Sequence, residues 1–99
     1  MAKFSVVTSE LTQKAEALRN LNNTFKQQID SLTEAEQNCC AQCKGPSIDK
    51  FNEQYQKDAE QFRLFYEGIE KFVQALEAEV REYEEKENIN LDQATTRTS

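Results

Sequence analysis

Cys43-Lys44-Gly45-Pro46 separates two long segments that both have the character of helices, and this stretch decides the fold. Glycine supplies the backbone freedom that a helix end needs, and proline is tolerated at the first position of a helix, where its missing N–H would have no partner. We therefore expect one helix over about residues 8–42, a turn at 43–46 and a second helix over about 47–87. A short turn between long helices forces them antiparallel, so the sequence predicts an all-α two-helix hairpin.

The first helical segment carries one apolar stripe. Residues 1–7 indicate a short extended lead-in, after which Thr8 or Ser9 can cap a helix. Apolar side chains then recur at helical spacing, and one row of them repeats every seven residues: Leu11, Leu18, Phe25, Leu32 and Cys39. This pattern predicts an amphipathic helix with that row in its buried seam.

The stripe of the second segment is heavier. Six residues repeat every seven positions: Ile48, Tyr55, Phe62, Ile69, Leu76 and Tyr83. Phenylalanines stand at complementary positions and smaller or aromatic residues flank them: Phe51, Phe65 and Phe72, then Ala59, Tyr66, Val73 and Val80. A single neighbouring helix covers only part of so wide a stripe.

The uncovered part of the second stripe predicts a partner. Two hairpins packed together would form a four-helix bundle and cover it, so we expect a dimer. The residues expected at the dimer interface all belong to the second helix: Phe51, Tyr55, Phe62, Phe65, Tyr66, Ile69, Phe72 and Val73.

Polar residues leave two points open and mark one boundary. Asn22 and Asp58 fall within the apolar stripes by angle, and each either fixes the register of packing or is turned to solvent by local curvature. After Asn88 the chain is polar and lacks periodicity, so residues 89–99 are expected to form a flexible tail.

The composition excludes several classes of function. A net charge of −6 argues against binding to nucleic acid or to anionic membrane surfaces. No run approaches the roughly 20 apolar residues of a membrane span, and the N-terminal apolar run is too short for a cleavable signal peptide. Without histidine or a glycine-rich phosphate loop, the chain has no constellation for catalysis, and we expect a binding protein that is not an enzyme.

Three cysteines cluster beside the turn. Cys40 and Cys43 have C-x-x-C spacing, but a structural zinc site needs four ligands and the chain offers three cysteines and no histidine. We expect no metal site and no cofactor, with Cys39 a small apolar filler and the other two incidental. In an oxidising compartment at least one thiol stays free or pairs between molecules.

Two short motifs carry a resemblance to a known family. Tyr83-Glu84-Glu85-Lys86-Glu87 follows the second stripe, and Cys43-Lys44-Gly45 occupies the turn. The chain resembles the hundred-residue WXG family, the small helical-hairpin substrates of type VII (ESAT-like) secretion in Gram-positive bacteria. That family has Trp-x-Gly at the turn and Tyr-x-x-x-Asp/Glu after the second helix. Here Cys43 stands in the place of the tryptophan.

The resemblance implies a function and partners. A chain of this kind pairs with itself or with a related chain, is read by the membrane-bound secretion ATPase, and passes from the cytoplasm to the cell envelope or the medium. Tyr83 and Glu87 would belong to the export signal, and Gly45 would shape the turn. From the residues alone, Tyr83 is equally the last residue of the seam, and Glu87 a solvated charge.

Two alternatives accompany this expectation. The turn without tryptophan also suits a dedicated adaptor for a larger toxin secreted by the same system, which would supply the missing signal. The pattern is also compatible with an ordinary cytoplasmic coiled-coil module that is never exported.

Overall fold

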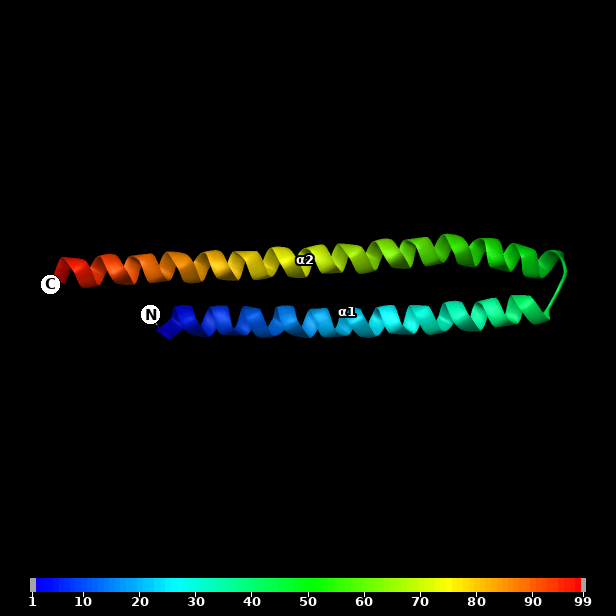
Figure 1. The fold of residues 1–99 in the computed structure, drawn as a ribbon, viewed down its shortest axis with the longest axis horizontal. Coiled ribbons are helices and arrows are strands. Elements are labelled where there is room, and N and C mark those ends of the chain that lie inside the picture. Colours follow the sequence, from blue (N-terminus) through cyan, green and yellow to red (C-terminus); the bar gives the residue numbers. More distant parts are fainter. Residues whose placement is uncertain (1, 99) are drawn as a thin grey trace.

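A computed structural model describes the backbone of residues 2–98 and the side chains of residues 7–88. Over this range the chain forms two helices, α1 (Ala2–Gln42) and α2 (Pro46–Thr98). They lie side by side and antiparallel (Figure 1), with Cα extents of 81 × 16 × 14 Å. The predicted all-α hairpin is confirmed, and its core is the seam between the two helices.

The turn has the chemistry that the sequence predicts. Gly45 has φ of +142°, a conformation that side chains with a Cβ rarely adopt, and Pro46 is the first residue of α2. The carbonyl of Gly45 accepts hydrogen bonds from the backbone N–H groups of Ile48 and Asp49, each at 3.1 Å. Gly45 is therefore the N-cap of α2, and Pro46 stands where no N–H is needed.

The outer ends of the helices differ from the prediction. Helix α1 begins at Ala2 and not near residue 8, and α2 continues to Thr98 instead of ending near residue 87. Neither 2–7 nor 88–98 contains glycine or proline, so no residue forces the backbone out of the helix. The backbone of 89–98, where the sequence predicts a flexible tail, belongs to α2, and Ser99 lies outside the described residues.

The two helices also differ in length. Helix α1 has 41 residues and α2 has 53. The C-terminal end of α2 consequently extends past the N-terminal end of α1 (Figure 1).

The buried seam of α1 is not the predicted row. Side chains every seven residues point most directly at α2: Thr8, Ala15, Asn22, Ile29 and Glu36. In the predicted row, Leu11, Leu18 and Phe25 are half-buried, while Leu32 and Cys39 are exposed. The two rows lie only about 50° apart around the helix axis, so a small rotation of α1 decides which row is buried.

Helix α2 contributes two rows to the seam. The predicted repeat is half-buried to buried from Ile48 to Leu76, and the second row contains Ala59, Tyr66, Val73 and Val80. Val73 is fully buried, and its row alternates with the first at spacings of three and four residues. This is the spacing of an antiparallel coiled coil.

Asn22 and Asp58, the two polar residues within the apolar stripes, differ in burial. Asn22 is only 4% exposed, and its Nδ2 donates to the carbonyl of Tyr66 and to Oε1 of Glu70, both at 3.1 Å. Asp58 is exposed and accepts a hydrogen bond from Gln54 on its own helix. Asn22 thus helps to fix the register between the helices, whereas Asp58 faces solvent.

Candidate interaction surface

The hairpin has two unlike faces on either side of its seam. In α1, residues three positions after the seam row lie on one side and residues four positions after it lie on the other. The ring of Phe25, on the first side, packs edge-on against Phe62 at 6.3 Å and Phe65 at 5.5 Å between centroids. The row of α2 that contains Phe65 therefore lies on the same face as Phe25.

We call this surface the apolar face. Its members come from both helices: Leu11, Leu18, Leu21, Phe25 and Leu32 of α1, and Phe51, Phe65 and Phe72 of α2. The three phenylalanines of α2 are 54%, 59% and 57% exposed, and Leu21 is 67% exposed. Soluble monomers rarely leave so many large apolar side chains together in water, so this face has the character of a binding surface.

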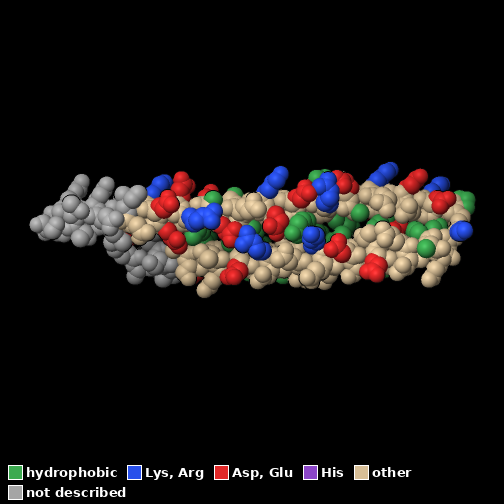
Figure 2. Space-filling view, in the orientation of Figure 1, with side chains coloured by type: hydrophobic (Ala, Val, Ile, Leu, Met, Phe, Trp, Pro, Cys, Tyr) green, Lys and Arg blue, Asp and Glu red, His purple; other side chains and the backbone are tan. Residues whose placement is uncertain are grey.

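The opposite side is the polar face. Arg19 donates from Nη1 and Nη2 to the two carboxylate oxygens of Glu77, at 2.8 and 2.6 Å, and so joins the helices. Lys26 places Nζ 5.4 Å from the centre of the Tyr66 ring. Figure 2 shows one face of the molecule on which acidic and basic side chains lie over both helices.

The Arg19–Glu77 pair shifts the titration of both groups. The hydrogen bond from Arg19 lowers the pKa of Glu77, and burial opposes this shift without reversing it. The same hydrogen bond raises the pKa of Arg19. The pair therefore favours ionised partners at neutral pH.

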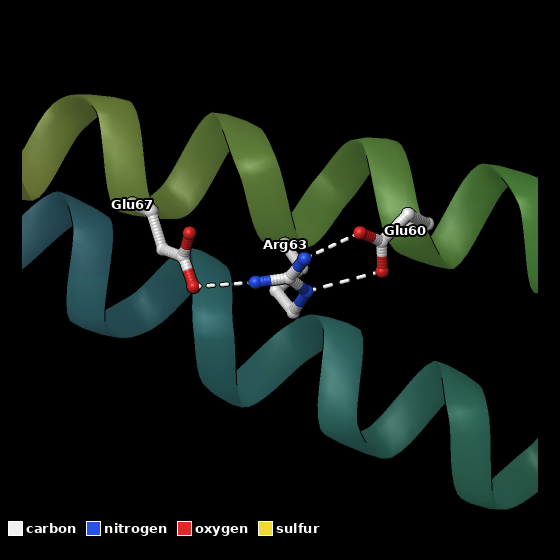
Figure 3. Close-up of polar contacts among 3 residues, drawn as sticks. All are labelled: Glu60, Arg63 and Glu67. Carbon is white, nitrogen blue, oxygen red and sulfur yellow. Dashed lines mark hydrogen bonds and ion pairs between the residues drawn. The ribbon is translucent and has the colours of Figure 1, made fainter.

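A second charge cluster lies wholly on α2. Arg63 bonds Glu60 through Nε, at 3.1 Å, and through Nη2, and it bonds Glu67 through Nη1, at 2.6 Å (Figure 3). The hydrogen bond from Arg63 lowers the pKa of Glu60. Because these residues are three and four positions apart, the cluster supports the helix and does not join it to α1.

The predicted dimer-interface residues divide into two groups. Phe51, Phe65 and Phe72 are exposed on the apolar face. The other five lie in the seam within one chain, where Tyr55 and Val73 are buried and three are half-buried: Phe62, Tyr66 and Ile69. Tyr55 and Val73 are therefore covered by α1 within one chain and do not lie on the exposed surface.

Helix α1 also contributes to the apolar face. Leu21 and Leu32 belong to the apolar face, beside Leu11, Leu18 and Phe25. The seven-residue spacing of Leu11, Leu18, Phe25 and Leu32 predicts contact with α2, but the structure turns part of this row toward the apolar face. Its true position depends on the rotation of α1, which periodicity alone does not give.

The cysteines surround the end of α1. Cys43 is exposed, and its N–H donates to the carbonyl of Cys39 at 3.0 Å in the last turn of the helix. Cys39 is exposed as well, so its predicted role as an apolar filler is wrong. Residue 39 belongs to the row that α1 turns away from the seam.

Cys40 differs from the other two cysteines. Its thiol donates to Oε1 of Glu36 at 3.1 Å, and this hydrogen bond, with burial, raises the pKa of Cys40 to about 11. Glu36 is only 5% exposed, and among the described residues its Oε2 finds no hydrogen-bond partner. Cys40 is therefore held as a poorly reactive thiol.

The two motifs of the resemblance lie at opposite ends of the hairpin. Cys43 and Gly45 form the turn, whereas Tyr83, which is 54% exposed, and Glu87, which is half-buried, lie near the start of α1. About 40 helical residues separate them, which corresponds to roughly 60 Å. One chain therefore does not bring the motifs together.

Within residues 7–88, no group of three or more histidine, cysteine or acidic side chains is placed to hold a metal ion. None of the helical stretches in the described part of the chain has the length and apolar character of a membrane span. No protein-family model, curated protein or solved structure matches this chain.

Proposed function

We propose that this protein is a protein-binding module whose apolar face is covered by a second helical hairpin, giving a four-helix bundle. The observation that carries the proposal is the exposure of Phe51, Phe65 and Phe72 on one face. Each ring is already nearly half covered within the hairpin, so its complete burial by a partner stabilises the complex by about 1–2 kcal/mol.

We further propose that the dimer serves type VII secretion, as the small hairpin substrates that it resembles do. The position of the motifs supports this, since an antiparallel partner would bring its turn close to Tyr83 and Glu87 of the first chain. The composite surface would then be read by the secretion ATPase. The partner is a second copy or a related chain.

Association is tested by light scattering coupled to size exclusion, with circular dichroism on the same peak and the thiols kept reduced. We expect a helical dimer of about twice the chain mass of 11.5 kDa. A folded species that keeps the mass of one chain at high micromolar concentration would contradict self-association, and would leave a different chain as the partner of the apolar face.

Export is tested in a Gram-positive host that carries a type VII system. We expect deletion of residues 84–99, or the double change Tyr83→Ala with Glu87→Gln, to abolish appearance in the culture supernatant while the dimer persists. Lys86→Ala is the control, because it alters the same segment outside the motif positions. Normal export of the truncated chain would overturn the assignment of residues 83–87 as an export signal. Retention of the intact chain in the cell would instead favour the cytoplasmic coiled coil.

One observation supports a second candidate, an adaptor for a larger secreted toxin. Cys43 is exposed but small, and therefore offers little apolar surface at the turn to a reading partner. A toxin with a helical N-terminal domain would then cover the apolar face and supply an aromatic ring in place of the tryptophan that Cys43 replaces. Recovery of such a complex, together with failure of the isolated chain to dimerise, would favour this role.

A further inference from the structure

Gly68 lies in the interior of α2, where glycine is the least suitable residue short of proline. Its side-chain position is exposed, and a Cβ built there meets no atom within 4 Å. Gly68 also lacks the positive φ that makes glycine necessary at Gly45. At an exposed helical site glycine costs about 1 kcal/mol relative to alanine, and no contact within the hairpin offsets this cost.

The location of Gly68 is the midpoint of the paired region. Asn22 bonds to Tyr66 and Glu70, which stand two residues before and two residues after Gly68. Asn22 is itself the middle residue of α1 (Ala2–Gln42). Gly68 therefore lies level with the centre of α1.

Gly68 also borders the apolar face. It follows Phe65 by three residues and precedes Phe72 by four, so the three share one side of α2. Both rings are more than half exposed. The glycine leaves a gap between them in which another helix can approach closely.

We propose that Gly68 is the contact point of a symmetric homodimer, in which two α2 helices cross antiparallel with their Gly68 residues facing each other. This inference rests on the proposed binding function and names the partner as a second copy of this chain. The two-fold axis would cross the hairpin at its midpoint, passing close to Gly68 in α2 and Leu21 in α1.

Apart from Phe51, which would face Lys86 of the second copy, the apolar residues of the face pair with one another about this axis. In α1, Leu11 would face Leu32 of the second copy, Leu18 would face its Phe25, and Leu21 would meet its own equivalent. In α2, Phe65 would face Phe72 of the second copy. The same axis pairs the apolar residues of α1 and those of α2, because the hairpin register places Asn22 level with Gly68. Contacts in which each copy uses the same surface are those of a two-fold dimer.

Charge also favours this two-fold axis, which runs across the helices, over a two-fold axis that runs parallel to them. The end of α2 carries six glutamates against Arg81 and Lys86: Glu77, Glu79, Glu82, Glu84, Glu85 and Glu87. A parallel axis would bring both acidic ends together and would set Leu11 and Leu32 opposite Glu79 and Asp58. An axis across the helices separates the acidic ends. It leaves one kind of like-charged contact, Asp58 with Glu79 of the second copy, which the two-fold symmetry makes twice.

The area of the face is sufficient for a stable dimer. About 40 paired residues span roughly 60 Å along the helices. With a hairpin width of 16 Å, one hairpin offers roughly 1,000 Å², compared with the ~800 Å² per partner of a standard interface.

The first test replaces the glycine. Helix propensity predicts that Gly68→Ala and Gly68→Leu strengthen the helix, whereas a close helix crossing predicts that added side chains push the two copies apart. We expect Gly68→Leu to raise the dimer dissociation constant at least tenfold in analytical ultracentrifugation, with a smaller rise for Gly68→Ala. Gln74→Leu, exposed outside the apolar face, adds the same side chain as a control and should leave the constant unchanged.

The second test joins the two copies covalently. In a background with Cys39, Cys40 and Cys43 replaced by serine, Gly68→Cys should give a disulfide-linked dimer on mild oxidation with glutathione disulfide. The equivalent change Leu64→Cys, on the outer side of α2, should stay unlinked.

The outcomes separate the two levels of inference. A dimer that tolerates Gly68→Leu and does not link through residue 68 would overturn this inference and leave the binding module standing. A parent chain that remains monomeric would overturn both the homodimer and the proposal that the module binds a second copy of itself. A dimer that is weakened by Gly68→Leu and linked through residue 68 supports both.

Discussion

At the scale of single residues, three polar side chains in the seam of α1 differ in how well they are satisfied. Thr8, Asn22 and Glu36 are all buried and stand fourteen residues apart. Asn22 has two partners on α2, but Glu36 uses one oxygen for Cys40 and leaves the other unpaired among the described residues. Glu36 is therefore the position in the seam at which an apolar residue should be preferred.

Replacement of this carboxylate should stabilise the hairpin. We expect Glu36→Leu to raise the free energy of unfolding by about 1 kcal/mol, because the variant no longer buries an unpaired oxygen. Urea denaturation at pH 7 and fixed protein concentration measures the change. Glu34→Leu, at an exposed position, should shift stability by less than about 0.5 kcal/mol. A less stable Glu36→Leu variant would show that the carboxylate has a partner that stabilises it.

The same change should release the Cys40 thiol. Its pKa of about 11 depends first on the hydrogen bond to Glu36, so the pKa should fall in Glu36→Leu and the thiolate fraction at pH 8 should rise about tenfold. The rate at which iodoacetamide modifies Cys40, with Cys39 and Cys43 replaced by serine, measures the thiolate fraction. An unchanged rate would mean that burial alone protects the thiol.

The turn depends on one glycine. Gly45→Ala should destabilise the hairpin by about 1–3 kcal/mol, because the backbone conformation is strained for any side chain. No atom lies within 4 Å of a Cβ at this site, so the loss would come from the backbone and not from a clash. Urea denaturation measures it, with Lys44→Ala as the neutral neighbour. Equal stability of the two variants would contradict the assignment of Gly45 as the required N-cap.

At the scale of the helices, ion pairs have different roles according to what they connect. Arg63 with Glu60 and Glu67 connects turns of α2 only, whereas Arg19 with Glu77 connects α1 to α2. Only the second pair is broken when the helices separate. Its contribution should therefore appear in the stability of the hairpin.

This contribution should depend on pH. The pKa of Glu77 is lower in the folded chain than its ordinary value of 4.5, so the stabilisation is present above about pH 4.5 and is lost as the pH falls through the lowered pKa. We expect Glu77→Gln to lower Tm at pH 7 and the difference from the parent chain to vanish in acid. Glu67→Gln is the matched control within α2 and should have the smaller effect. A constant difference at all pH values would exclude the ion pair as its source.

At the scale of the whole molecule, the two faces differ in what they contact. Arg19 on the polar face and Asn22 in the seam join α1 to α2, while the apolar face remains open along the hairpin. Changes on the apolar face should therefore affect association more than the helical fold.

The phenylalanines provide the test. We expect Phe65→Ser with Phe72→Ser to raise the dimer dissociation constant by about 100-fold or more, because two rings lose their buried environment. Sedimentation equilibrium measures this, and the circular dichroism of the diluted monomer should stay helical. Leu64→Ser, on the outer side of α2, is the control. Dimers of unchanged affinity would place the interface elsewhere.

The sequence by itself determined the hairpin. Gly45-Pro46 placed the turn, and heptad spacing gave both helices, because breakers and periodicity act through local backbone geometry. The outer ends were less predictable from sequence, since residues 2–7 and 88–98 contain neither a strong stop nor a clear stripe.

Only the tertiary structure decided which row of α1 faces α2. Rows three residues apart are nearly adjacent around a helix, so the choice between the row of Leu32 and the row of Asn22 depends on contacts across the seam. Those contacts bury Asn22, expose Phe65 and Phe72, and set Gly68 level with the middle of α1, beside the apolar face. Periodicity fixes the angle between rows along one helix, but the rotation of that helix against its neighbour is a property of the pair.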